Sequence, residues 1–166
     1  NTTKSFDNIF FTDKPLFLKK LNIFLNNKDK YECGIPHTFG LLLHGEPGTG
    51  KTSLCKALAK YTNRHIFNIN LKIIKTCEDF YSIFNCNYAN KIKISKKNII
   101  ILLDDIDCMG NIVHARKNNE TSLIDDKKEN VNELTLSYIL NIIDGVCEDT
   151  NRILIMTSNH PELLDP

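Results

Sequence analysis

The sequence predicts an α/β sandwich in which helices cover both faces of a parallel β-sheet. Apolar runs typical of strands alternate along the chain with segments of helical period, the arrangement that right-handed crossovers produce. A glycine-rich turn separates the first of these strands from the helix that follows it. The length of 166 residues and the hydrophobic fraction of 42% suit one domain with a full core. We therefore expect residues 1–166 to form a single α/β domain.

The lead-in over residues 1–36 contains the first predicted helix. Asp13 offers an N-cap carboxylate, and Pro15 falls in the first turn, where its missing N–H does no harm. Apolar residues then recur at helical spacing and form one face: Phe17, Leu21, Phe24 and Leu25. The segment 34–36 ends this helix and leads into a strand over 39–44. That strand is continuously apolar, which indicates that both of its faces are covered.

The elements after the glycine-rich turn continue the same alternation. We expect a helix that opens at the turn and has its apolar repeat over 54–61, helices over 78–86 and 134–143, and strands over 65–70, 98–103 and 152–157. Gly145 sits where a glycine commonly ends a helix. Residues 109–130 are polar, charged and without period, so we expect a surface loop there.

The turn itself, GEPGTGKT over 45–52, matches the pattern G-x-x-x-x-G-K-[ST] between a strand and a helix. Glycines let backbone N–H groups wrap around phosphate oxygens, and the helix N-terminus adds partial positive charge. Lys51 supplies a cation to the terminal phosphates, and the Thr52 hydroxyl is a ligand for Mg²⁺. A turn that binds no ligand is the alternative, which the complete octapeptide disfavours. The predicted nucleotide-binding residues of this turn are Gly45, Glu46, Pro47, Gly48, Thr49, Gly50, Lys51, Thr52 and Ser53.

Acidic residues follow the third predicted strand, at the edge of a parallel sheet where ligands bind. Asp104 is placed to hold Mg²⁺, and Asp105 to orient or deprotonate an attacking water. Aspartates that merely solvate a strand end are the alternative, which fits one acid better than the group of Asp104, Asp105 and Asp107. Asn159 follows the fourth strand and could hold the same water against the γ-phosphate, although asparagine is also an ordinary turn residue there.

Charge and cysteine usage narrow the classes of partner and compartment. The net charge of +1 gives no basic footprint for nucleic acid, and the arginines are Arg64, Arg116 and Arg152. The 6 cysteines are scattered singly, which favours reduced thiols in a reducing compartment. The apolar run at 99–103 is far shorter than the roughly 20 residues that span a bilayer. Because the chain begins at Asn1 rather than Met, we expect sequence upstream of it.

The segments GEPGTGKT, LLDDID, LSYILNIIDG and MTSNHPELLDP together resemble AAA-type ATPases. Residues 134–145 and 152–166 are similar in particular to the branch that contains the mitochondrial inner-membrane chaperone and translocase of the Rieske iron–sulfur protein, which acts in assembly of respiratory complex III. The segments SFDNIFF and YECGIPHTFGLLLHGEPGTGKTSL support this resemblance, which fades over 71–97 and 109–130.

The resemblance implies a P-loop NTPase sandwich, the large subdomain of an AAA module without its fifth strand and helical lid. Residues 45–52 would be the Walker A loop, Asp104 and Asp105 the Walker B acids, and Asn159 the sensor of the γ-phosphate. Gly34 and Ile35 would lie near the adenine. It further implies ATP and Mg²⁺ as cofactors, a homo-oligomeric ring and a protein substrate. It also implies attachment to a membrane, the mitochondrial inner membrane, through upstream sequence; a cytoplasmic location is the alternative.

The sequence departs from the family pattern at four places. Glu46 replaces a usual proline and brings negative charge near the phosphates, which we expect to weaken binding. Asp105 stands where most relatives have glutamate, which draws the carboxylate back by about 1.5 Å; since this branch often has aspartate there, we expect slow hydrolysis. No pore motif follows the second strand. The chain stops at Pro166, before the arginine fingers and a fifth strand, so we expect an unpaired edge at 40–44.

Several functions are compatible with these features. The leading hypothesis is an ATPase that forms a ring and remodels or translocates protein substrates. The second is an ATP-dependent switch or scaffold with little hydrolysis, which Glu46 and Asp105 favour. A nucleic-acid motor or clamp loader fits the fold but not the near-zero net charge. A nucleoside kinase would need a lid and an acceptor site, and no arginine cluster indicates either.

Overall fold

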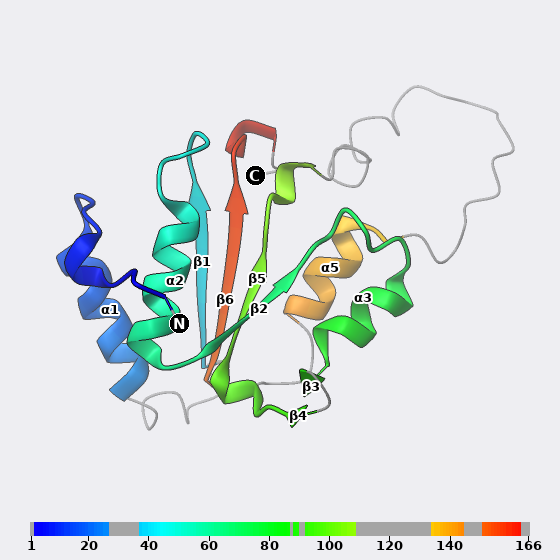
Figure 1. Cartoon of the computed structure of the whole chain (residues 1–166). Coiled ribbons are helices and arrows are strands. Elements are labelled where there is room, and N and C mark those ends of the chain that lie inside the picture. Colours follow the sequence, from blue (N-terminus) through cyan, green and yellow to red (C-terminus); the bar gives the residue numbers. More distant parts are fainter. Residues whose placement is uncertain are drawn as a thin grey trace, which may run out of the picture.

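The predicted parallel sheet is present. The computed structural model describes residues 2–26, 37–86, 88–89, 92–108, 134–144 and 151–163. The sheet has four strands in the order β1-β6-β5-β2, all parallel to their neighbours (Figure 1). Their bounds are β1 Thr38–His44, β2 His65–Ile69, β5 Ile99–Leu103 and β6 Arg152–Ser158. Each strand lies within one residue of its prediction, which confirms the α/β class.

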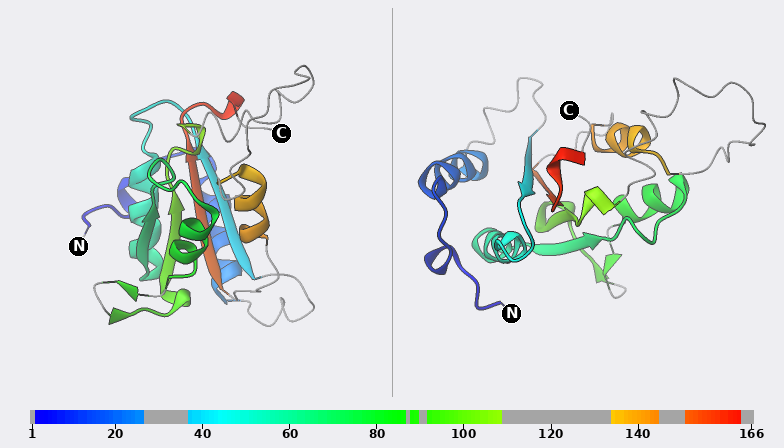
Figure 2. Two further views of the ribbon diagram at one scale, coloured as in Figure 1. Left: turned by 90° about the vertical axis from the view of Figure 1, so that its right-hand side faces the viewer. Right: turned by 90° about the horizontal axis from the view of Figure 1, so that it is seen from above.

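Helices pack on both faces of this sheet and complete three layers, as Figure 2 shows. The α-helices are α1 Lys14–Asn26, α2 Lys51–Thr62, α3 Cys77–Phe84 and α5 Leu136–Ile143. Short 3-10 turns are η1 Phe6–Asn8, η3 Lys96–Asn98, η4 Ile106–Cys108 and η5 Pro161–Leu163. A small antiparallel pair, β3 Tyr88–Ala89 and β4 Ile92–Lys93, was not predicted.

The first core lies between the sheet and the layer of α1 and α2. Leu58 of α2 and Ile153 of β6 are fully buried in it. Phe24 fixes α1 to the sheet, because its ring lies 5.2 Å from that of Phe39 and its carbonyl oxygen is 2.9 Å from Nε2 of His37. The helix that carries the phosphate-binding turn is therefore held on the sheet by a continuous apolar layer.

The second core lies on the opposite face, under α3 and α5. Phe80 of α3 and Ile139 of α5 pack there against Ile69, Leu103 and Leu154 from the central strands and β2. Thr76 and Thr135 cap these two helices, each accepting a hydrogen bond from a backbone N–H of the first turn. The first of these helices begins one residue before its prediction and ends two residues earlier, and the second begins two residues after its prediction, because Thr76 and Thr135 take the cap positions.

The prediction that both faces of the first strand are covered is wrong. In β1 the half-buried and exposed positions alternate, and Leu42 is 46% exposed. The second core contains residues of β2, β5 and β6 but none of β1, because α3 and α5 lie over those three strands. Within the described part of the chain β1 also pairs with β6 alone, which agrees with the expected edge at 40–44.

Some predictions fall on residues outside those that the structure describes. These are the surface loop at 109–130, Gly145 and the segment 34–36 with Gly34 and Ile35. Among the described helices, none has the length and apolar composition that a membrane span requires.

Cys55 of α2 lies in the first core and is 1% exposed. Burial, aided by the negative charge of Asp104, raises the pKa of its thiol from 9.0 to about 11. Since the unfolded chain releases this proton first, the free energy of unfolding should fall as pH rises from 9.0 towards about 11, by roughly 2 kcal/mol. Urea denaturation across this window measures the loss. The Cys55→Ala variant should lack this part of the pH dependence, and parallel curves for both proteins would contradict the assignment.

Candidate functional site

The predicted site residues meet at one edge of the sheet, where β1, β5 and β6 end. Figure 1 shows these three carboxyl ends at the same edge, with the phosphate-binding turn 45–50 arching from β1 into α2. The turn is tied to β6, since the N–H of Gly45 donates to the carbonyl oxygen of Ser158 over 3.3 Å. Parallel strands thus bring together residues as far apart in the sequence as Gly45 and Ser158.

The glycines of the turn have conformations that other residues rarely adopt. Gly45, Gly48 and Gly50 have φ angles of 140°, 86° and 98°. A Cβ atom on Gly45 would lie 3.3 Å from the hydroxyl of Thr49, so side chains there would crowd the turn as well as strain it. Gly50 is the N-cap of α2, which leaves the first backbone N–H groups of the helix directed at the turn. The turn has the form of an anion cradle.

The ammonium group of Lys51 lies at the centre of the site. Its Nζ donates to the carbonyl oxygens of Gly45 over 2.5 Å and Glu46 over 3.1 Å, and to Oδ1 of Asn159 over 2.7 Å. In this state the cation is held by the turn itself and by the end of β6. These neutral acceptors leave its positive charge uncompensated, which favours an anionic ligand in their place.

Asn159 joins the turn to the acidic end of β5. While Oδ1 accepts from Lys51, Nδ2 donates to Oδ1 of Asp105 over 3.0 Å. The backbone N–H of Asn159 donates to Oδ1 of Asp107 over 2.9 Å, so the amide side chain starts from a fixed backbone position. A continuous chain of hydrogen bonds therefore runs from Lys51 through Asn159 to Asp105.

The two adjacent acids are fixed by a buried hydroxyl on the neighbouring strand. Thr157 is 1% exposed, and its hydroxyl donates to Oδ1 of Asp104 over 2.6 Å. The hydroxyl oxygen of Thr157 also accepts a hydrogen bond from the backbone N–H of Asp105 over 2.9 Å. Asp105 has a φ of 51°, in the left-handed region that asparagine and aspartate tolerate better than most residues. Thr157 thus stabilises the turn that directs the two carboxylates.

Asp107 is 7% exposed, and its carboxylate holds the backbone of Asn159 in place. Burial alone would raise the pKa of Asp107, but hydrogen bonds from the Asn159 backbone and the Ser158 side chain outweigh it and lower that pKa. The carboxylate is therefore ionised at neutral pH and acts as a stable acceptor for Asn159.

Replacing Thr157 with valine should separate its polar role from its volume. The substitution leaves the Asp105 N–H and one Asp104 oxygen without their partner, which should lower the free energy of unfolding by about 1–3 kcal/mol. Urea denaturation measures the loss. Thr157→Ser, which keeps the hydroxyl but loses the methyl group, should retain more of the stability than the valine variant; a valine variant as stable as the parent would show that the hydroxyl is not needed.

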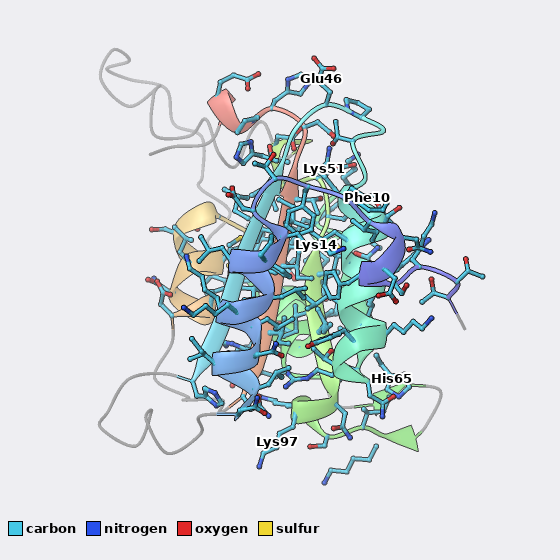
Figure 3. All side chains as sticks on the ribbon, turned by 90° about the vertical axis from the view of Figure 1, so that its left-hand side faces the viewer. Phe10, Lys14, Glu46, Lys51, His65 and Lys97 are labelled. Atoms are coloured by element: carbon cyan, nitrogen blue, oxygen red, sulfur yellow. The ribbon has the colours of Figure 1, made fainter. Side chains whose placement is uncertain are left out.

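The remaining predicted residues are distributed around this centre. Thr52 and Ser53 lie in the first turn of α2. Glu46 is exposed at the outer tip of the loop, and Figure 3 shows its side chain directed away from Lys51. Gly34 and Ile35 are not among the described residues, so their placement near the adenine stays a prediction.

The donors around the turn suit a magnesium ion that is shared with phosphates. In the described ranges, no three His, Cys, Asp or Glu side chains gather into a self-contained metal site. The predicted ligands are one hydroxyl, Thr52, and one carboxylate, Asp104. Hard oxygen donors in small number fit Mg²⁺, which commonly takes its other ligands from water and substrate phosphates.

Sequence reasoning missed Thr157 and the supporting role of Asp107. Both follow from the parallel register, in which Leu103 pairs with Met156 and the residues after them become neighbours. The sequence did contain one usable signal, since a hydroxyl residue and a polar run, TSN, end an otherwise apolar strand.

Comparisons with known proteins agree with the observed α/β fold. Residues 41–166 match the family described as ATPase family associated with various cellular activities (AAA). The chain is similar to AAA-ATPase At3g28610 of Arabidopsis thaliana, with 34% identity over 163 residues that cover 92% of this chain and 33% of that protein. It is also similar to AAA-ATPase At5g17730 of the same organism, with 38% identity over 151 residues, 88% of this chain and 29% of that protein. The chain therefore spans about a third of the length of these relatives.

Proposed function

Because the chain belongs to the AAA family of ATPases, as its match over residues 41–166 shows, we propose that it binds ATP and hydrolyses it with the help of Mg²⁺. The observation that carries the proposal is the hydrogen-bonded chain from Lys51 through Asn159 to Asp105. It links the cation that would bind phosphate to the carboxylate that would activate water. A glycine turn without a ligand would have no need of this connection.

Each residue has a separate role in the proposed reaction. The backbone N–H groups of the turn 45–50 and the start of α2 bind the phosphates, and Lys51 neutralises their charge. Thr52 and Asp104 hold the Mg²⁺ ion, which supplies Lewis-acid stabilisation of the phosphate charge when bound. Asp105 accepts a proton from the attacking water, and Asn159 orients that water against the terminal phosphate.

Nucleotide binding would rearrange the contacts of Lys51. Phosphate oxygens are stronger acceptors for an ammonium group than the amide oxygen of Asn159 or the loop carbonyls. Once Lys51 turns to the phosphates, Oδ1 of Asn159 becomes free to accept from a water, while Nδ2 keeps its bond to Asp105. The same amide would thereby report that the site is filled and position the nucleophile.

We further propose that the intact protein acts as a homo-oligomeric ring on a protein substrate. Support comes from the family, while the segments at 134–145 and 152–166 support the branch of the mitochondrial Rieske-protein translocase. Because the chain spans about a third of the length of its relatives, oligomerisation, substrate and any membrane attachment belong to the whole protein.

The exposed side chain of Glu46 is compatible with phosphate binding, since its charge points away from Lys51.

An ATP-dependent switch with little turnover is the second candidate, and the short carboxylate of Asp105 favours it. Phosphate release by the full-length protein with Mg-ATP decides between the two. Turnover that Asp105→Ala removes would establish the ATPase. Nucleotide binding without turnover in either protein would leave the switch, and no binding at all would reject both.

A further inference from the structure

A second concave site lies at the end of α2 that is remote from the phosphate-binding turn. It is a groove of about 840 Å³ between the N-terminal segment 2–4, the last turns of α2 and the start of β2. Figure 1 shows the N-terminal segment beside α2, and Figure 3 shows Lys51 and His65 towards opposite ends of that helix. Lys56 and Lys60 of the groove follow Lys51 on α2 by about 7.5 and about 13.5 Å along the helix axis.

Among the described residues, this basic groove is lined by cationic and neutral side chains and by no acid. Its charged and titratable residues are Lys4, Lys56, Lys60, Arg64 and His65. Within the described residues, none of these five side chains forms an ion pair. The chain as a whole has 21 basic and 20 acidic residues, so a cluster without any carboxylate is a local feature and does not follow from composition.

Helix stabilisation accounts for part of this cluster. Lys60 lies in the last turn of α2, where a cation interacts favourably with the helix dipole. Lys56 lies four residues earlier on the same face, and like charges at this spacing destabilise a helix. Lys4 adds a further cation from a separate segment. The repulsion within the groove is unrelieved by the described protein groups, and an anion would relieve it.

Arg64 lines the groove, and hydrogen bonds fix the position of its guanidinium group. It is 9% exposed, and its terminal nitrogens donate to the backbone oxygen of Asn151 over 2.7 Å and to the side-chain oxygen over 2.8 Å. Both acceptors are neutral, so the guanidinium keeps its charge while its position is set. Arg64 therefore adds an ordered cation to the exposed lysines Lys56 and Lys60 that line the same groove.

We propose that the basic groove binds a phosphate-dense anion, either a free polyphosphate or the multiply phosphorylated headgroup of a lipid. Each phosphate carries up to about two charges and three acceptor oxygens, which matches four cations in one small volume better than peptide carboxylates do. Thr2, Thr3 and Asn63 add neutral donors at the rim. Among the described residues, no Phe, Tyr or Trp side chain lines the groove, so it lacks the broad stacking surface on which single-stranded nucleic acid binds.

Calorimetry of the full-length protein with sodium tripolyphosphate tests the proposal. The Lys51→Ala background removes binding at the turn, so failure here would leave the proposed ATPase function untouched. Lys56→Gln together with Lys60→Gln should weaken binding about tenfold or more, because two charged hydrogen bonds are lost. Lys19→Gln with Lys20→Gln, an equal loss of charge on the exposed side of α1, should change it by less than about twofold.

Parallel titrations identify the class of ligand. Vesicles that contain a phosphoinositide bisphosphate should bind if a headgroup is the natural ligand, and only free polyphosphate should bind if it is soluble; either supports the proposal. Polyglutamate or single-stranded DNA that binds the groove as tightly as tripolyphosphate would overturn it. So would an equal loss in the two double variants, or no binding in the background protein, provided thermal denaturation shows all of them folded.

Discussion

Replacing Lys51 with alanine should weaken Mg-ATP binding by roughly 100-fold or more. The expectation follows from the central position of its ammonium group, which makes three hydrogen bonds to neutral acceptors. Charge-assisted bonds to phosphate oxygens would replace them, and losing two such bonds costs about 3 kcal/mol or more. Calorimetric titration of the full-length protein with Mg-ATP measures the change.

The matched control is Lys20→Ala, which removes an exposed lysine from α1, outside both the phosphate-binding turn and the basic groove. It should leave Mg-ATP affinity unchanged within about twofold, because an exposed charge away from the site is screened by salt. If Lys51→Ala bound Mg-ATP as tightly as the control, the proposed phosphate site would be wrong. Urea denaturation of both variants distinguishes lost binding from lost folding.

Replacing Asp105 with asparagine should lower turnover by about 10²–10⁴-fold while nucleotide binding changes little. Asparagine is the informative substitution because it tolerates the φ of 51° at this position and can still accept from Nδ2 of Asn159. The loss should therefore report on the carboxylate as a base, without a change in the backbone. Phosphate release under saturating Mg-ATP gives the rate.

Asp13→Asn, which removes one exposed carboxylate next to α1, is the control for lost charge and should keep the parent rate. Turnover by Asp105→Asn at the parent rate would show that this carboxylate is not the base. A parallel loss of affinity would instead assign Asp105 to binding. The two readings are separable because rate and affinity are measured on the same protein.

The strands and helices were predictable because their signals are local. Continuous apolar runs mark β5 and β6, and the glycine pattern fixes the start of α2 at Lys51. The exposure of Leu42 was not predictable, since it depends on where α3 and α5 settle on the far face of the sheet. The pair β3–β4 is too short to leave a period in the sequence.

The sequence was sufficient to predict which residues form the site, but not how they contact one another. The sequence brings Lys51, Asp105 and Asn159 to the same edge of the sheet through parallel topology. It could not predict that Asn159 contacts both of the others at once, because that requires the register and the left-handed turn at Asp105. The bridging hydroxyl of Thr157 depends on the same register.

The outward edge of β1 bears on how the protein behaves when concentrated. Among the described residues, one side of this strand presents its N–H and C=O groups to no partner strand, and Leu42 of the same strand is exposed on a face of the sheet. Such an edge is a template on which a strand from another molecule can add. A sample of residues 1–166 alone should therefore self-associate as concentration rises, and Leu42→Lys should reduce this association in sedimentation.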